Sequence, residues 1–240
     1  MNEIVDMKSL TVEKFAKMMD HALLVPETTT EEIIAACRKS ASYKVSCVFV
    51  QPCFLGTVVG LLEGTGVHAG SVVGFPQGVT RSVVKAYEAE DIVKLGGQEV
   101  DMVQNIGMLL EGNYEYVLKD IRMVRDAIGQ DIILKVILET HYLDQNQIVM
   151  ACKIAEEAGA NFVKTSTGFA PTGHTVENLR LMRQTVSSTV GVKAAQGVRS
   201  LKIALNAIQA GANILGATQT FEILDDFKST DPSKLDELLN

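Results

Sequence analysis

The sequence predicts an α/β fold, namely a TIM (β/α)8 barrel with an extra N-terminal helix. Eight short apolar runs alternate with segments of helical periodicity, and each strand and helix together span about 20 to 30 residues. No linker, low-complexity stretch or block of like charges interrupts the series. A series of βα units in 240 residues is typical of such a barrel, which contains about 250 residues. We therefore expect residues 1–240 to form a single barrel domain.

The expected strands are apolar runs that end at turn residues. They lie at residues 22–24, 47–50, 70–74, 99–105, 132–139, 161–165, 191–194 and 213–216. An open, doubly wound sheet is the alternative fold for this alternation of strands and helices. A glycine-rich dinucleotide-binding loop after the first strand would favour that sheet, and HALLVPETT at 21–29 is not such a loop.

The segments between the strands carry the start and stop signals of helices. Residues 29–43 open on threonines followed by two glutamates, and residues 81–97 end on a pair of glycines. Residues 146–160 and 200–212 both end on Ala-Gly-Ala directly before an expected strand. The extra N-terminal helix is expected over residues 11–20, TVEKFAKMMD, and a final helix with a frayed end is expected after Phe221.

Composition and charge narrow the classes of function. The chain is 47% hydrophobic and 21% charged, as in soluble globular proteins, and its net charge of −7 without any basic run argues against nucleic acid or an anionic membrane as the main partner. No signal peptide and no run of 18 apolar residues is evident, so we expect a cytoplasmic protein without a membrane span. The four histidines and four cysteines show no metal-ligand spacing, so we expect no metal and reduced, buried thiols.

Charged residues lie in four consecutive expected strands, the fourth to the seventh, which carry Asp101, Lys135, Lys164 and Lys193. Active sites of TIM barrels lie at the C-terminal ends of the strands. Because side chains alternate along a strand, Lys135 shares a face with Glu139. A single lysine of this kind is usually one whose stem packs while its ammonium group reaches water. Four such residues pointing inward, one carboxylate and three ammonium groups, instead indicate a catalytic cluster.

The chemistry that suits this cluster is imine formation. A lysine attacks a carbonyl group only when it is unprotonated, and at a pKa of about 10.4 very few free lysines are unprotonated at pH 7. A second cation and an apolar environment both lower that pKa. Lys164 and Lys193 on adjacent strands supply the like charges, and Asp101 supplies a proton acceptor. The sequence therefore predicts a Schiff-base aldolase of class I.

Several motifs resemble those of deoxyribose-phosphate aldolases. They are VVGFPQG at 72–78, EVDMVQNIG at 99–107, ILKVILET at 133–140, FVKTSTGF at 162–169 and GVKAAQGVRS at 191–200. The resemblance extends from Asp20 to Gly216. It implies a TIM barrel without metal or other cofactor, an aldehyde-lyase that reversibly cleaves 2-deoxy-D-ribose 5-phosphate to D-glyceraldehyde 3-phosphate and acetaldehyde.

The resemblance also implies roles for the four charged residues. Lys164 would be the lysine that forms the Schiff base, and Lys193 the second lysine that perturbs it. Asp101 would be the acid of the proton relay, with Lys135 as its partner.

Two loops depart from the family pattern where the family holds the substrate phosphate. Gln196 stands where the first of two glycines is usual, and LGATQTF at 215–221 replaces a Gly-Thr-Ser-Ser or Gly-Ala-Ser-Ser motif. Glycine lets a phosphate approach the backbone, whereas a glutamine side chain can obstruct it. The residues expected to bind the substrate and its phosphate are Gly168, Gln196, Gly197, Gly216, Thr218 and Gln219.

Three alternatives remain open. Gln196 and Gln219 favour a related Schiff-base aldolase that acts on a different or non-phosphorylated aldehyde or deoxysugar. A sugar-phosphate isomerase would explain charges at strand ends but not the pair of Lys164 and Lys193, and a non-catalytic sugar binder would not need an intact cluster. The expected partners are small aldehydes and sugar phosphates, and a homodimer is left open.

Overall fold

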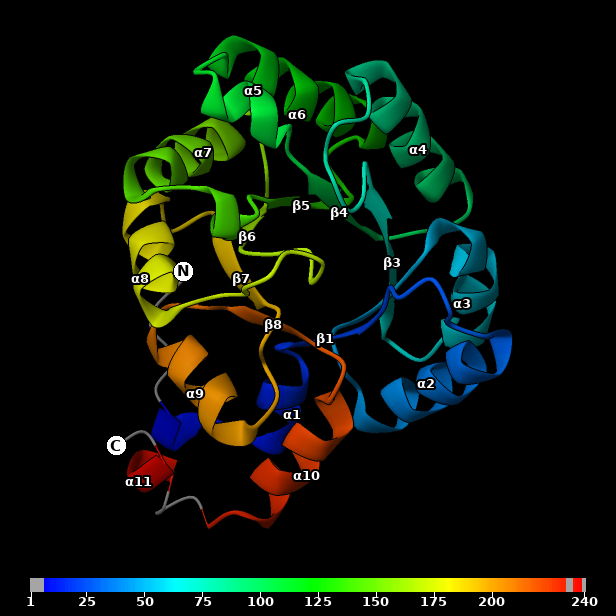
Figure 1. The fold of residues 1–240 in the computed structure, drawn as a ribbon. Helices are drawn as coiled ribbons and strands as arrows, with labels where there is room; N and C mark the ends of the chain where they lie inside the picture. Colours follow the sequence, from blue (N-terminus) through cyan, green and yellow to red (C-terminus); the bar gives the residue numbers. More distant parts are fainter. Residues whose placement is uncertain (1–6, 232–234, 239–240) are drawn as a thin grey trace.

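The computed structural model describes residues 7–231 and 235–238 and contains a closed barrel of eight parallel strands, as predicted. The strands are β1 Met19–Leu23, β2 Cys47–Val50, β3 His68–Val73, β4 Glu99–Val103, β5 Ile133–Ile137, β6 Phe162–Lys164, β7 Gly191–Ala195 and β8 Ile214–Ala217. They pair in sequence order, and β8 closes the barrel on β1. Figure 1 shows the ring of strands enclosed by the helices.

The helices follow the strands around the barrel. The longer ones are α2 Thr30–Tyr43, α3 Leu55–Leu62, α4 Ser82–Lys94, α6 Tyr114–Ile128, α7 Gln145–Glu157, α8 Val176–Thr185, α9 Leu201–Gln209 and α10 Thr220–Ser229. The short ones are η1 Met7–Ser9, α1 Val12–Ala16, η2 Pro52–Phe54, α5 Ile106–Leu110, η3 Thr140–Tyr142 and α11 Leu235–Leu238. The helix start expected at residues 29–43 is present and includes a capping box, because Thr29 and Glu32 bond each other's backbone N–H groups. Part of the end expected to fray, 232–234 and 239–240, lies outside the described residues.

The N-terminal helix is shorter than predicted. We expected a helix over 11–20 and a first strand at 22–24, but α1 ends at Ala16 and Met19 already belongs to β1. The apolar spacing of Phe15, Ala16 and Met19 fits one face of a helix, so periodicity alone did not reveal the strand. The consequence is that Asp20 lies in a barrel strand.

Glycines make room for aromatic rings among the strands. A Cβ atom at Gly70 would lie 2.8 Å from the ring of Phe49, and one at Gly191 would lie 2.2 Å from the ring of Phe162. Gly70 of β3 is paired with Phe49 of β2, and Gly191 of β7 is paired with Phe162 of β6. The two rings therefore occupy space that side chains at the glycines would otherwise fill.

The cysteines differ from the prediction at one position. All four are free, and Cys37, Cys47 and Cys152 are buried as expected, but Cys53 is exposed. Cys53 lies in η2, a short turn of helix that leaves the barrel after β2, so its apolar sequence neighbours do not cover it. Within residues 7–231 and 235–238, no helix has the length and apolar character needed to span a membrane.

Candidate active site

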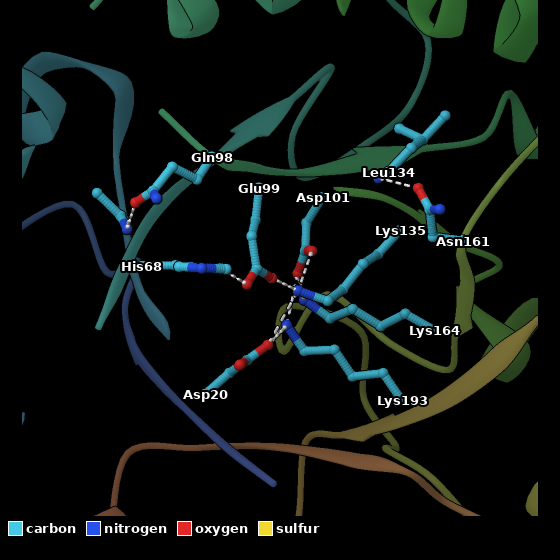
Figure 2. A network of polar contacts seen from close by, with 11 residues as sticks. Asp20, His68, Gln98, Glu99, Asp101, Leu134, Lys135, Asn161, Lys164 and Lys193 are labelled. Carbon is cyan, nitrogen blue, oxygen red and sulfur yellow. Dashed lines mark hydrogen bonds and ion pairs between the residues drawn. The ribbon is translucent and has the colours of Figure 1, made fainter. Parts of the chain in front are cut away.

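The four side chains predicted to be catalytic meet inside the barrel. Lys164 ends β6 and is paired with Lys193 of β7, while Asp101 of β4 is paired with Lys135 of β5. All four are buried. Figure 2 shows the three ammonium groups converging on one small region from neighbouring strands.

Asp101 connects two of the lysines directly. Its Oδ2 accepts a hydrogen bond from Lys164 Nζ at 2.7 Å and another from Lys193 Nζ at 2.8 Å. Lys135 Nζ lies farther away, 3.9 Å from Asp101 Oδ1. One carboxylate oxygen thus lies between two ammonium groups and is placed to exchange a proton with either.

Two carboxylates missed in the sequence complete the cluster. Asp20 Oδ2 lies 2.7 Å from Lys193 Nζ and 3.2 Å from Lys135 Nζ, and Lys135 also donates to Glu99 Oε2. The expectation of one carboxylate facing three ammonium groups was therefore wrong, because three carboxylates face three lysines. Buried charges are costly unless they are paired, so this balance is what permits the lysines to lie in the lumen.

The sequence contains a signal for Glu99 but not for Asp20. Glu99 stands two residues before Asp101 and therefore shares its face of β4, a signal that alternation supplies. Asp20 was assigned to the N-terminal helix, and only the observed start of β1 brings it into the barrel. Glu99 also contacts His68 Nδ1 at 2.8 Å, and the His68 side chain is 41% exposed at the N-terminal end of β3.

An aromatic ring, also missed in the sequence, lies beside the three ammonium groups. The centroid of the Phe49 ring is 4.0 Å from Lys193 Nζ, 4.6 Å from Lys135 Nζ and 6.0 Å from Lys164 Nζ. The face of an aromatic ring attracts cations, most strongly where water is excluded. Phe49 thus adds a favourable contact for Lys193 in particular, and a weaker one for Lys164.

The environment of Lys164 favours its reactive form. Burial lowers the pKa of Lys164 to about 8; the Asp101 carboxylate opposes this effect, and the nearby Lys193 ammonium group adds to it. With this pKa, roughly one Lys164 side chain in ten is an unprotonated amine at pH 7, far more than for a free lysine. This fraction of unprotonated amine would allow Lys164 to attack a carbonyl group.

The neighbours of Lys164 have pKa values shifted in other directions. Burial would lower the pKa of Lys135, but Asp20 and Glu99 outweigh it and raise that pKa well above its usual value. Burial would raise the pKa of the Asp101 carboxyl, but Lys164 and then Lys193 hold it below its usual range. Asp101 is therefore ionised at neutral pH and can accept a proton.

A cavity of about 230 Å³ leads to the lysines from the C-terminal ends of the strands. Lys164 and Lys193 are among its lining residues, and Asp101 and Lys135 are not. The cavity is also lined by the six residues predicted to bind the substrate and its phosphate: Gly168, Gln196, Gly197, Gly216, Thr218 and Gln219. A substrate in this cavity would touch the two lysines, whereas Asp101 would act through them.

The glutamines that depart from the family pattern bond within the protein. Gln196 has a left-handed backbone, with φ of 62°, and its Nε2 donates to Ala170 O at 2.6 Å. Its Oε1 is buried and has no hydrogen-bond partner among the described residues. Thr218 Oγ1 donates to Gln219 Oε1 at 2.9 Å. The hydroxyl of Thr218 and one amide hydrogen of Gln196 are thus already engaged.

No metal-binding cluster is evident in the described part of the chain, since no three His, Cys, Asp or Glu side chains there form a candidate ligand set. The three carboxylates of the lumen contact lysines instead.

The fold and site together define a TIM-barrel protein with a buried lysine of lowered pKa at the end of its sixth strand, beside a second lysine and a carboxylate. The model of the DeoC/LacD family aldolases matches residues 14–219, and the chain belongs to this family.

Similar proteins carry one recurrent name. A deoxyribose-phosphate aldolase of Caldanaerobacter subterraneus subsp. tengcongensis is 45% identical, over 92% of this chain and 96% of the relative. One from Clostridium kluyveri is 41% identical, over 89% of this chain and 98% of the relative. The structure of the deoxyribose phosphate aldolase from Aeropyrum pernix, described as a unique tetramer, superposes with a TM-score of 0.84 at 32% identity and covers 91% of this chain and 93% of that chain.

Proposed function

We propose that this protein is a deoxyribose-phosphate aldolase. It would reversibly cleave 2-deoxy-D-ribose 5-phosphate to D-glyceraldehyde 3-phosphate and acetaldehyde. The observation that carries this proposal is the buried Lys164, whose pKa of about 8 and place at the cavity suit imine formation. The names of the similar proteins support the same reaction.

In the cleavage direction, the neutral Nζ of Lys164 attacks C1 of the open-chain sugar, and loss of water gives an imine. The C3 hydroxyl then loses its proton, and the bond between C2 and C3 breaks. The electron pair of that bond moves toward the imine, which leaves an enamine on Lys164 and releases D-glyceraldehyde 3-phosphate. Protonation at C2 and addition of water then release acetaldehyde and the free amine.

The neighbours of Lys164 supply the proton transfers. Asp101 contacts Lys164 and Lys193 through one oxygen, so a proton can pass between either amine and the carboxylate. Lys193 also lines the cavity, where its ammonium group can donate a proton to a reacting oxygen or carbon. Lys135, held by Asp20 and Glu99, keeps the carboxylates in place.

Release of acetaldehyde from 2-deoxyribose 5-phosphate tests the proposed reaction. The purified protein should produce acetaldehyde and D-glyceraldehyde 3-phosphate in equal amounts. A sugar-phosphate isomerase would instead give an isomeric sugar phosphate without acetaldehyde, and a sugar binder would leave the compound unchanged. Either of those results would replace the proposed reaction.

A second candidate, a related aldolase with a weaker preference for phosphorylated substrate, is favoured by Gln196. A residue other than glycine in the left-handed region is unusual, and its side chain crosses from the loop after β7 to the loop after β6. It would occupy space that a glycine leaves open to a phosphate. The same assay with unphosphorylated 2-deoxyribose measures this preference.

We further propose that residues 1–240 form one barrel domain, that the protein acts in the cytoplasm and that it assembles as a homodimer. The free cysteines suit a reducing compartment. Self-association finds support in the tetramer described for the Aeropyrum pernix protein. Light scattering after gel filtration would give the mass of the assembly, and a monomer would refute the dimer.

A further inference from the structure

Glu139 is a buried acid for which the mechanism above has no role. Its side chain follows β5, its residue is 2% exposed, and its backbone is left-handed with φ of 54°. No lysine or arginine in the described part of the chain forms an ion pair with it; burial raises its pKa, although the hydrogen bonds from Thr167 and the charge of Lys164 oppose this effect. A strained backbone and a buried carboxylate each cost free energy, and such costs concentrate at functional sites.

The partner of Glu139 is a residue of the loop that follows Lys164. Thr167 N lies 3.2 Å from Glu139 Oε2 and 3.3 Å from Oε1, and Thr167 Oγ1 donates to Oε2. Thr167 is buried and stands three residues after Lys164. Both hydrogen-bond donors of this residue are therefore directed to one carboxylate.

The hydrogen bonds between Glu139 and Thr167 hold a part of the loop after β6 that no backbone hydrogen bond to the turn after β5 holds. Leu138 N donates to Lys164 O at 2.8 Å, and Thr140 N donates to Thr165 O at 2.9 Å. These bonds hold the base of the loop, whereas the following residues 166–169, here called the STGF loop, are joined to the turn after β5 through Glu139.

The STGF loop separates two cavities. Thr167 and Phe169 line the catalytic cavity and also a second cavity of about 380 Å³ behind the loop, which Glu139 lines as well. Phe169 N donates to Thr167 Oγ1 at 3.0 Å, so Thr167 also orders the backbone of Phe169. Phe169 is 48% exposed and meets the edge of Phe75 at a centroid distance of 5.4 Å. Without the carboxylate, the loop has space behind it into which it can move.

We propose that Glu139 is a positioning residue, which fixes the STGF loop through Thr167 and thereby shapes the part of the cavity that receives the acceptor aldehyde. This inference rests on the proposed aldolase function. The donor, acetaldehyde, needs only Lys164 and its cluster to form an imine. The larger acceptor extends past Lys164 along the cavity wall that Thr167, Gly168 and Phe169 provide.

Two assays on a small set of variants test the proposal. The variants are Glu139→Gln, Thr167→Val, both together, and Thr167→Ser, which keeps the hydroxyl. The first assay is the rate at which acetaldehyde and borohydride modify Lys164, and the second is KM for D-glyceraldehyde 3-phosphate in the addition reaction. Thr172→Val is the matched control, because Thr172 Oγ1 bonds His141 between the same two loops but lines neither cavity.

We expect the variants to change the acceptor KM much more than the rate of imine trapping. Glu139→Gln and Thr167→Val should raise the acceptor KM by on the order of tenfold, the effect of losing one hydrogen bond to a charged group. The rate of imine trapping should change much less than the acceptor KM. The double variant should be no worse than the worse single one, because both changes weaken the same contact. Thr167→Ser and Thr172→Val should resemble the wild type.

Other outcomes overturn the proposal. An unchanged acceptor KM in Thr167→Val would refute it even if Glu139→Gln failed to fold. Equal losses in trapping and in acceptor KM would show a general structural role. If the wild-type protein itself formed no imine, the proposed function would fail first, and that failure is distinguishable because it precedes any comparison of variants.

Discussion

At the scale of single residues, Lys164 and Lys193 differ although both touch the same oxygen of Asp101. Among the described residues, Lys164 Nζ has one carboxylate partner, whereas Lys193 Nζ also contacts Asp20 at 2.7 Å and lies 4.0 Å from the Phe49 ring. Lys193 is thus held by more partners in the lumen than Lys164 is. This difference supports our proposal that Lys164, whose pKa burial lowers to about 8, is the amine that forms the imine.

The lowered pKa of Lys164 predicts how the rate depends on pH. Imine formation should accelerate as the pH rises to about 8, because deprotonation creates the nucleophile, and should level off above that value. The measurement is the initial rate of borohydride trapping with acetaldehyde at a series of pH values. A rate that kept rising toward the ordinary lysine pKa of about 10.4 would contradict the assigned environment.

The glutamines of the cavity predict a change in substrate preference. Gln196→Gly combined with Gln219→Ser should raise the ratio of kcat/KM for 2-deoxyribose 5-phosphate over 2-deoxyribose. One regained hydrogen bond to a charged group corresponds to roughly 10- to 150-fold. Both sugars should be measured in both proteins. No change in the ratio would mean that the two side chains do not face the phosphate.

At the scale of secondary-structure elements, paired glycines and aromatic rings determine how neighbouring strands fit. Gly191 begins β7 beside Phe162 of β6, and Lys164 lies two residues after Phe162 on the same face. The space left by Gly191 therefore helps to set the packing of the strand that carries Lys164.

Gly191→Ala should destabilise the protein by about 1 to 3 kcal/mol, because the new methyl group would overlap the Phe162 ring and force it to shift. Gly60→Ala in α3 is the matched control. No atom lies within 4 Å of a Cβ at Gly60, so this change should raise the free energy of unfolding by about 0.5 to 1 kcal/mol. Urea denaturation measures both. Equal stability of the two variants would contradict the packing described for β6 and β7.

The strands and helices also show which features the sequence could predict and which it could not. Repeated apolar runs and helix signals located seven strands to within about two residues, as expected for strongly patterned segments. The expectation that Asp101 and Lys135 point into the lumen came from the barrel fold together with their charge. Asp20 was not predicted to lie in the barrel because the apolar pattern before it fits a helix. Phe49 was not predicted to be part of the site because a phenylalanine in an apolar strand is typical of a hydrophobic core. Only the closed barrel shows that its ring contacts three lysines.

At the scale of the whole molecule, barrel closure assembles the site. Pairing of β8 with β1 brings Asp20 within 2.7 Å of Lys193, which lies far away in the sequence. Figure 2 shows the resulting cluster with carboxylates on one side and lysines on the other. The charge balance of the lumen is thus a property of the closed barrel, and no single βα unit contains it.

The balanced cluster predicts activity without a metal ion. In the proposed reaction the imine accepts the electron pair, so a Lewis acid has no step to perform. The protein should keep full activity after exhaustive treatment with EDTA and gel filtration. Loss of activity that zinc restores would assign the reaction to the other class of aldolase.

Chemical trapping shows whether Lys164 forms the imine. The protein is incubated with acetaldehyde and sodium borohydride, digested, and analysed by mass spectrometry. We predict one stable ethyl group, located on Lys164, and none in Lys164→Arg, because a guanidinium group stays protonated and forms no imine at neutral pH. An ethyl group on Lys193 or Lys135 instead, or catalytic turnover retained by Lys164→Arg, would contradict this prediction.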